Sequence, residues 1–287
     1  MKTVNRRNSV SRAGSMDRRN SGGVSADFLK LAALVTMLID HVGAGLLERI
    51  LADGYAEDPL VYQRILGLDQ LLRVIGRVSF PIFCFLLVEG YIHTRSRRAY
   101  ALRLFVFALL SELPFDLLFF GGWNPRSQNV FWTLLIGLLA LWGADALRCR
   151  IPGAPGRERV FEKAAAILVP AAAMLAAWLL KTDYSWRGVL LIVMISFLRR
   201  DRLLLVIEAP FLFLLTEFLD LMLRGSSAAY SLETTLSHLT VFLPFFLIRF
   251  YDGSRRRKGH RYFFYLFYPA HLLILFFFRQ ILYILYG

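Results

Sequence analysis

An aspartate and a histidine, Asp40 and His41, stand side by side within the apolar run LAALVTMLIDHVGAGLL. Ionisable groups in such a segment are costly unless they have partners or a function. A histidine side chain has an ordinary pKa of about 6.5, so it can take up and release a proton near neutral pH. We therefore interpret His41 as a candidate general base or nucleophile.

The neighbours of His41 on the helix have different expected roles. Adjacent helical residues point about 100° apart, so Asp40 does not face His41. We place Asp40 in the predicted catalytic centre but expect its carboxylate to pair with a cation on another helix, with Arg77 as the first candidate. Lys30 precedes His41 by eleven residues, which is about three turns and ~16 Å along the axis. Lys30 and His41 therefore share a face, with Lys30 near the membrane surface and His41 deep.

Other apolar runs also carry polar residues. His271 lies in the last run, and we expect it near mid-membrane as a second proton carrier, an acyl carrier or a structural neighbour of His41. Glu112 and Asp116 are four residues apart and share one face of a helix. They are expected either to pair structurally with Arg77 or to act directly. The residues expected to line the outer half of the protein are Arg77, Glu112, Asp116 and Asn129.

Long apolar segments must position these side chains. Nine runs approach the ~20 residues that cross ~30 Å of hydrocarbon as a helix, although one is short. The runs are 28–49, 78–94, 100–120, 129–147, 163–180, 186–199, 202–223, 234–250 and 262–286. The sequence therefore predicts an all-α membrane helix bundle with about nine transmembrane helices. Residues 50–77 are the longest predicted outer loop, and a disordered basic tail at 1–27 precedes the transmembrane domain at 28–287.

Charge gives the expected orientation. Of the 34 Lys and Arg residues, 24 lie in the segments 1–27, 95–103, 148–163, 199–202 and 249–261. Basic loops stay in the cytoplasm, so we expect these segments and the N-terminus to lie inside. The net charge of +13 does not indicate nucleic-acid binding, because no aromatic-basic module or zinc spacing accompanies it. The two cysteines, Cys84 and Cys149, do not indicate a disulfide framework.

At these residues the chain resembles the TraX family of membrane proteins. The resemblance covers residues from about 28 to the C-terminus, and its motifs occur in order. They are LKLAALVTMLIDHVG at 29–43, IGRVSFPIFCFLLVEGYIHT at 75–94, LLSELPFDLLF at 109–119, NVFWTLLIGLLAL at 129–141, DYSWRGVLLI at 183–192 and YLFYPAHLLIL at 265–275.

The resemblance implies an acetyltransferase of the bacterial cytoplasmic membrane, of which the founding members act on the N-terminus of conjugative pilin. The family is also similar to the acyltransferase-3 class, which carries a basic residue and a histidine at the spacing of Lys30 and His41. A cytoplasmic cavity would then hold the phosphates of acetyl-CoA near Lys30 and deliver the thioester to His41. The acceptor, a protein or glycan amine or hydroxyl, would enter at the outer half. No metal is expected.

Two other function classes fit parts of the pattern. Buried Asp, Glu and His residues also mark the proton relays of transporters, but the chain shows no pair of similar halves of the kind many secondary transporters have. A membrane scaffold for a surface appendage would not need an ionisable pair in mid-span. General-base and acyl-histidine mechanisms both remain open for His41.

Overall fold

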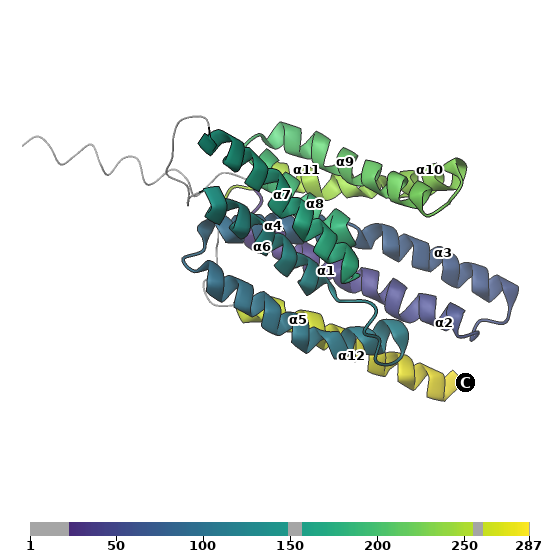
Figure 1. The fold of residues 1–287 in the computed structure, drawn as a ribbon. Helices are drawn as coiled ribbons and strands as arrows, with labels where there is room; N and C mark the ends of the chain where they lie inside the picture. The colour runs from purple at the N-terminus through teal and green to yellow at the C-terminus, as the bar shows by residue number, and fades with distance from the viewer. Residues whose placement is uncertain (1–22, 149–156, 255–260, 287) are drawn as a thin grey trace, which may run out of the picture.

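The computed structural model describes residues 23–148, 157–254 and 261–286, and these ranges form an elongated bundle of helices (Figure 1). The predicted basic tail falls mostly on residues 1–22, which lie outside the described residues. The elements are α1 (Ala26–Val42), the π-helix η1 (Gly43–Leu47), α2 (Glu48–Ala52), α3 (Pro59–Gly76), α4 (Ser79–His93), α5 (Arg97–Phe120), α6 (Val130–Arg148), α7 (Arg157–Leu179), α8 (Ser185–Leu198), α9 (Arg202–Leu223), α10 (Ala228–Ser237), the short 3₁₀ turn η2 (Leu239–Val241), α11 (Phe242–Arg249) and α12 (Arg261–Tyr286).

All nine predicted apolar runs fall on helices. Within the described residues, four helices are long and apolar enough to cross a membrane, at Ala26–Ala52, Pro59–His93, Val130–Leu147 and Tyr262–Leu285. A fifth crossing is possible at the bent pair Ala228–Ser237 and Leu239–Arg249, whose axes differ by 41°. The chain is therefore an all-helical membrane protein with four or five helices that meet this test.

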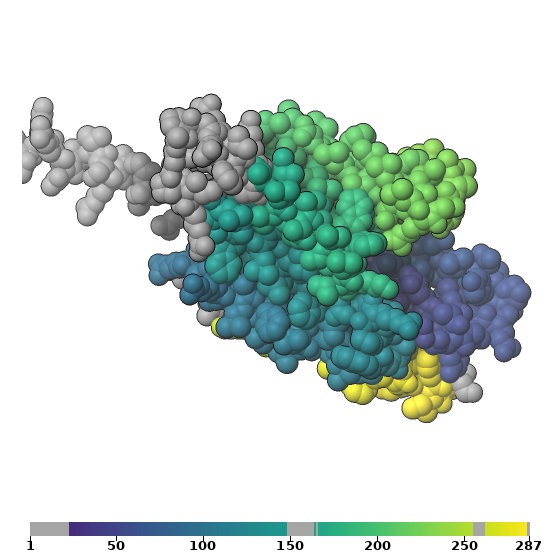
Figure 2. All heavy atoms as spheres, viewed as in Figure 1, coloured from purple at the N-terminus to yellow at the C-terminus, as the bar shows by residue number. Residues whose placement is uncertain are grey.

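Apolar side chains also cover the outer surface. On α5, Leu102, Leu109 and Leu113 are 61, 54 and 53% exposed. Figure 2 shows the face on which α5 and α6 lie below α9 and α10. Leucines exposed along a helix between charged ends are typical of a surface that faces lipid.

The prediction of a loop at 50–77 is wrong, because most of this segment is the helix α3. Asp58 caps its start by accepting hydrogen bonds from the backbone N–H groups of Leu60 and Val61 at 2.8 and 3.0 Å. Pro59 occupies the first turn, where its missing N–H costs nothing. This Asp-Pro start signal was present in the sequence. The charges spaced along α3 hid the helix from a search for apolar runs.

Described parts of the predicted cytoplasmic segments meet at one end of the bundle. The Val24 N–H donates to the Phe250 carbonyl at 2.8 Å, and the Ala26 N–H donates to the Ser254 carbonyl at 3.0 Å. Arg202 donates to the Arg249 carbonyl at 3.1 Å. Arg199 lies 3.8 Å from the Glu89 carboxylate on α4. The start of α1 and the turns after α4, α8 and α11 therefore share one end.

A glycine sets the approach of α3 to α1. A Cβ atom added at Gly76 would lie 2.2 Å from the Cβ of Asp40 and 2.5 Å from its Cγ. The Asp40 Cβ is fixed to the backbone and cannot move away from such a contact. Gly76 therefore lets α3 pack beside the residue that precedes His41.

We expect Gly76→Ala to destabilise the protein by about 1–3 kcal/mol, the usual cost of overpacking. Gly67→Ala on the same helix is the matched control, because a Cβ there meets nothing within 4 Å. Replacing a helical glycine in open space should stabilise by about 0.5–1 kcal/mol. Denaturant unfolding in detergent measures both changes. Equal effects of the two substitutions would contradict the close approach of α3 to α1.

Candidate active site

His41 on α1 and His271 on α12 contact each other, although they are far apart in the sequence. Nδ1 of His41 lies 2.7 Å from Nε2 of His271. The ring planes differ by only 3° and the ring centres are 5.0 Å apart, which suits a hydrogen bond along an in-plane lone pair. His271 is buried, at 5% exposed. The two predicted histidines thus form one polar centre inside the bundle.

The hydrogen bonds assign the protons of this pair. Nδ1 of His271 lies 2.7 Å from the Phe267 carbonyl oxygen, which can only accept, so this nitrogen carries a proton. In a neutral ring Nε2 of His271 is then the acceptor, and Nδ1–H of His41 donates to it. Nε2 of His41 is left with its lone pair. The neutral pair therefore presents one basic nitrogen, which is the atom needed for proton uptake or nucleophilic attack.

Aromatic rings surround the two histidines. The ring centres of Phe119 and Tyr268 lie 5.4 and 5.8 Å from that of His41, both edge-on. The Phe267 ring centre lies 4.9 Å from that of His271. These contacts hold both imidazoles in place and limit the access of water to them.

A cavity of about 580 Å³ approaches this pair from the end where the predicted cytoplasmic segments meet. Its exposed rim includes Arg95, Ser96 and Ala99, at the turn between α4 and α5. Its lining also contains Met37, four residues before His41, and Tyr268, whose ring contacts His41. The volume is in the range of small-molecule sites. The cavity therefore extends from a basic rim to the aromatic wall beside the histidines.

Lys30 lines this cavity. Its ammonium lies 3.4 Å from the Asp27 carboxylate and 5.0 Å from the centre of the Phe264 ring. Lys30 is thus already engaged by an acid and an aromatic ring. Its role in binding a cofactor stays a prediction.

Asp40 does not take the partner that the sequence suggested. Its carboxylate accepts a hydrogen bond at 2.7 Å from Arg73, one turn before Arg77 on α3. Arg73 also lies 3.2 Å from Glu48, so it bridges two acids of the first helical segment. The prediction of an Asp40–Arg77 pair is corrected, because it took 50–77 to be a loop. Asp40 is a neighbour of the histidine pair that joins α1 to α3.

The loop between α7 and α8 is a feature that the sequence reasoning missed. Lys181, Tyr184 and Ser185 have positive φ angles of 52°, 60° and 48°. Such strained conformations persist where the surroundings impose them, often at functional sites. Burial raises the pKa of Asp183 in this loop to about 6; Asp40 raises it too, whereas Arg73 lowers it. Asp183 therefore belongs to the charged group around Asp40 and Arg73.

Glu112 and Asp116 lie on α5, and Asn129 lies at the end of the α5–α6 connection, just before α6. Glu112 accepts hydrogen bonds from the Asn129 amide and, at 2.9 Å, from the Trp132 indole. Asp116 accepts from the Asn124 backbone N–H at 2.9 Å. These contacts tie α5 to the start of α6, so pairing of the acids with Arg77 is not what holds them. Their predicted role in binding the acceptor is untested.

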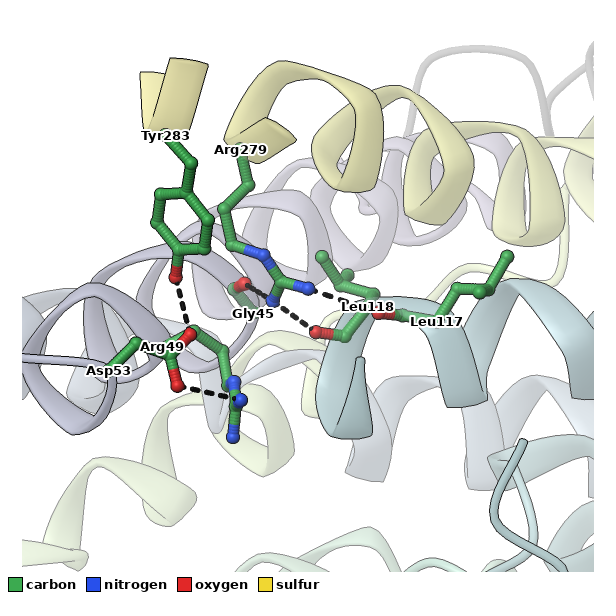
Figure 3. A network of polar contacts seen from close by, with 7 residues as sticks. All are labelled: Gly45, Arg49, Asp53, Leu117, Leu118, Arg279 and Tyr283. Atoms are coloured by element: carbon green, nitrogen blue, oxygen red, sulfur yellow. Dashed lines mark hydrogen bonds and ion pairs between the residues drawn. The ribbon is translucent and has the colours of Figure 1, made fainter. Parts of the chain in front are cut away.

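Arg279 is a second feature missed by the sequence reasoning, although it stands within the last apolar run. Its side chain is 1% exposed. Figure 3 shows its guanidinium pointing between η1 and the end of α5. It donates to the carbonyls of Gly45, Leu118 and Leu117 at 2.9, 2.5 and 3.1 Å. The last carbonyls of a helix lack internal partners, so Arg279 caps the C-terminus of α5 and fixes it to η1.

The π-helix itself begins two residues after His41. Single π-helical turns within α-helices are frequent at functional sites. A Cβ added at Gly45 within it would lie 2.6–2.8 Å from the Leu118 side chain, so this turn presses directly on α5. The backbone after His41, the end of α5 and α12 are therefore held together by one arginine.

The described residues do not gather three or more His, Cys, Asp or Glu side chains in a way that would hold a metal ion.

A family model described as "TraX protein" matches residues 25–279. The chain belongs to the TraX family. This confirms the resemblance drawn from the ordered motifs, and the match contains both histidines, Lys30 and the strained loop. The chain is also similar to the "Probable fimbrial assembly protein FimC, serogroup H1" of Dichelobacter nodosus. The two are 29% identical over 269 residues, which is 88% of this chain and 94% of that protein. No solved structure matches the chain.

We expect Arg279→Gln to destabilise this TraX protein by about 3 kcal/mol or more, because buried carbonyls lose charged donors. Arg224→Gln is the matched control, since the Arg224 side chain is 70% exposed at the end of α9 and, among the described residues, forms an ion pair only with Asp220 one turn earlier. The control should lose less than about 1 kcal/mol. Thermal and denaturant unfolding in detergent compare the two. Similar midpoints for both variants would argue against the capping role of Arg279.

Proposed function

We propose that this protein is a membrane acyltransferase that moves an acetyl group from cytoplasmic acetyl-CoA to an amine or hydroxyl acceptor. The observation that carries the proposal is the basic nitrogen of His41, located beside the end of a cavity with a basic rim. Membership in the TraX family supports the same chemistry. The proposed reaction requires no metal ion.

The donor matches the cavity in shape and polarity. Acetyl-CoA carries its phosphates at one end of a long, flexible arm and its thioester at the other. The rim supplies Arg95, and Lys30 also lines the cavity. The rest of the lining includes apolar side chains such as Phe131 and Leu134, together with the acid Glu89, which lies 3.8 Å from Arg199. The thioester would lie next to Tyr268, beside the histidine pair.

The proton transfers follow from the assigned tautomers. The acceptor amine or hydroxyl attacks the thioester carbonyl while Nε2 of His41 takes its proton. The resulting imidazolium still donates through Nδ1–H to His271, which can share the charge through its own bond to the Phe267 carbonyl. The C–S bond then breaks, and His41 returns the proton to the thiolate. The products are the acetylated acceptor and free coenzyme A.

The acceptor is proposed from the relatives and from the outer half of the molecule. TraX membership and the similarity to a protein named as a fimbrial assembly protein favour a pilus subunit, with a cell-surface glycan as the alternative. Asp40, Arg73 and Asp183 form a charged group next to the histidines that such an acceptor could meet. A proton-coupled transporter is the second candidate, because a buried histidine pair can also relay protons.

The orientation is part of the proposal. We propose about nine crossings with the N-terminus in the cytoplasm, because the basic segments gather at the end where the cavity opens. The cavity then opens toward the compartment that contains acetyl-CoA. The α2–α3 turn lies at the opposite, outer end.

Cysteine labelling tests this orientation in a variant without Cys84 and Cys149. A single cysteine in place of Ala99, on the cavity rim, should react with an impermeant maleimide only from the cytoplasmic side. A cysteine in place of Glu57, in the α2–α3 turn, should react only from outside. Coenzyme A should slow the labelling at position 99 and leave position 57 unchanged. The reverse sidedness would overturn both the topology and a cytoplasmic donor.

Substitution of the histidines tests the chemistry. His41→Gln cannot take up a proton and should lower transfer of labelled acetyl from acetyl-CoA by ~10²–10⁴-fold. His271→Gln should lower it less, by about ten- to a hundredfold, because it removes the partner of the base rather than the base. His238→Gln is the control, since His238 pairs with Glu217 at 2.7 Å away from the cavity. Rates are compared per folded molecule, with pilin or glycan preparations as acceptor. Near-normal transfer by His41→Gln would disprove the mechanism, and equal losses at both sites would indicate a two-histidine relay.

A further inference from the structure

The cations around the cavity differ in whether the protein already neutralises them. Lys30 is engaged by Asp27 and Phe264. Arg97, on the first turn of α5 but not in the cavity lining, lies 3.2 Å from the Asp145 carboxylate. Arg103 and the exposed Arg95 both line the cavity, and within the described part of the chain neither makes an ion pair. The charge of Arg103 is therefore available to a ligand.

The Arg103 side chain is also held ready for one. Its guanidinium carbon lies 5.4 Å from the centre of the Tyr100 ring, one turn earlier on α5. Tyr100 is itself buried, at 9% exposed, and lines the same cavity. A cation over an aromatic face is attracted to it and loses rotational freedom. Tyr100 thus fixes the guanidinium before any ligand arrives.

One donor of Arg103 has no acceptor. Its Nε atom is buried and makes no hydrogen bond to any described residue. A buried N–H without a partner is costly, and the cost is recovered when an acceptor arrives. Nε and a terminal nitrogen together form a planar fork that fits two oxygens of one phosphate. The Nε atoms of Arg49, Arg77 and Arg279 are unpaired in the same way, but of these four arginines Arg103 alone lines the cavity. An anion with several oxygens that enters the cavity, such as a phosphate, therefore fits this side chain.

The position of Arg103 along α5 indicates which phosphate of coenzyme A it would contact. Arg103 lies six residues into α5, about 9 Å from the start of the helix. Arg95, in contrast, stands in the exposed turn at the rim. A coenzyme A molecule entering with its thiol end first would place its outer phosphate near Arg95. The phosphates next to the pantetheine arm would lie deeper, near Arg103.

We propose that Arg103, held by Tyr100, binds the diphosphate next to the pantetheine arm of the donor and so sets the depth to which the thioester enters. This proposal rests on the proposed function for the identity of the donor as an acyl-CoA. Arg103 then bears the main phosphate contact, and Lys30 adds charge at the side of the cavity.

Equilibrium binding to the purified full-length protein tests this site without requiring transfer. The three probes are coenzyme A, 4′-phosphopantetheine and pantetheine, which share the arm and differ in phosphates. In Arg103→Gln we expect the affinity for the first two probes to fall about ten- to a hundredfold, as for one lost charged hydrogen-bonding group. The affinity for pantetheine should not change. Arg98→Gln is the matched control, because Arg98 is exposed on the same helix and does not line the cavity.

The other outcomes of these binding measurements can be told apart. Equal losses for all three probes would mean that Arg103 only maintains the fold, and this would overturn the proposal. A loss for coenzyme A alone would place Arg103 at the adenosine end and would also overturn it. If Arg103→Gln does not fold, Arg103→Lys decides, since lysine keeps the charge but lacks the fork and should show a smaller loss of the same pattern. Phosphate-dependent binding without acetyl transfer in any assay would uphold this site and refute the proposed function instead.

Discussion

The hydrogen bond from His41 Nδ1–H to His271 Nε2 is the contact on which the arrangement of this protein depends. It joins the first and last helices of the bundle across a distance of 2.7 Å. A hydrogen bond tolerates little error in distance or angle, so α1 and α12 must keep their register. Arg279 provides that restraint within the same helix as His271, by fixing η1 and the end of α5. The π-turn after His41 and the capped end of α5 are therefore parts of one support.

Polar groups around the histidine pair have partners of their own, and this is how an apolar bundle accommodates them. Asp40 is neutralised by Arg73, and Glu112 is hydrogen-bonded by Asn129 and Trp132. Two nitrogen atoms near the cavity differ from these paired acids, because each can still bind a further group. Nε2 of His41 has a lone pair, and Nε of Arg103 has an unused proton. Nε2 of His41 suits a reacting group, and Nε of Arg103 suits a phosphate. The cavity extends from the α4–α5 turn, which carries its rim, to the side of the histidine pair.

Much of this was predictable from the sequence, for physical reasons. His41, His271 and Lys30 stand out because ionisable residues in apolar runs are rare, and helical spacing placed Lys30 and His41 on one face. The direct contact between the histidines was not predictable, since it depends on how α12 packs against α1. The partner of Asp40 was mistaken because α3 carries charges at intervals and was read as a loop. Arg279 also stands within an apolar run, so its presence was a signal that was overlooked, but its acceptors are backbone carbonyls and could not be predicted from the sequence. The positive φ angles at 181–185 likewise fall on residues that do not favour them, so only the structure reveals them.

The most direct test of the account is a cryo-electron-microscopy structure of the protein with a ketone analogue of acetyl-CoA that cannot transfer its acetyl group. We expect the analogue to fill the cavity from the rim, with its ketone carbonyl next to Tyr268 and within contact of Nε2 of His41. The same map should show His41 and His271 still hydrogen-bonded. An analogue that binds outside the cavity, or whose carbonyl lies away from the histidine pair, would contradict the central claim.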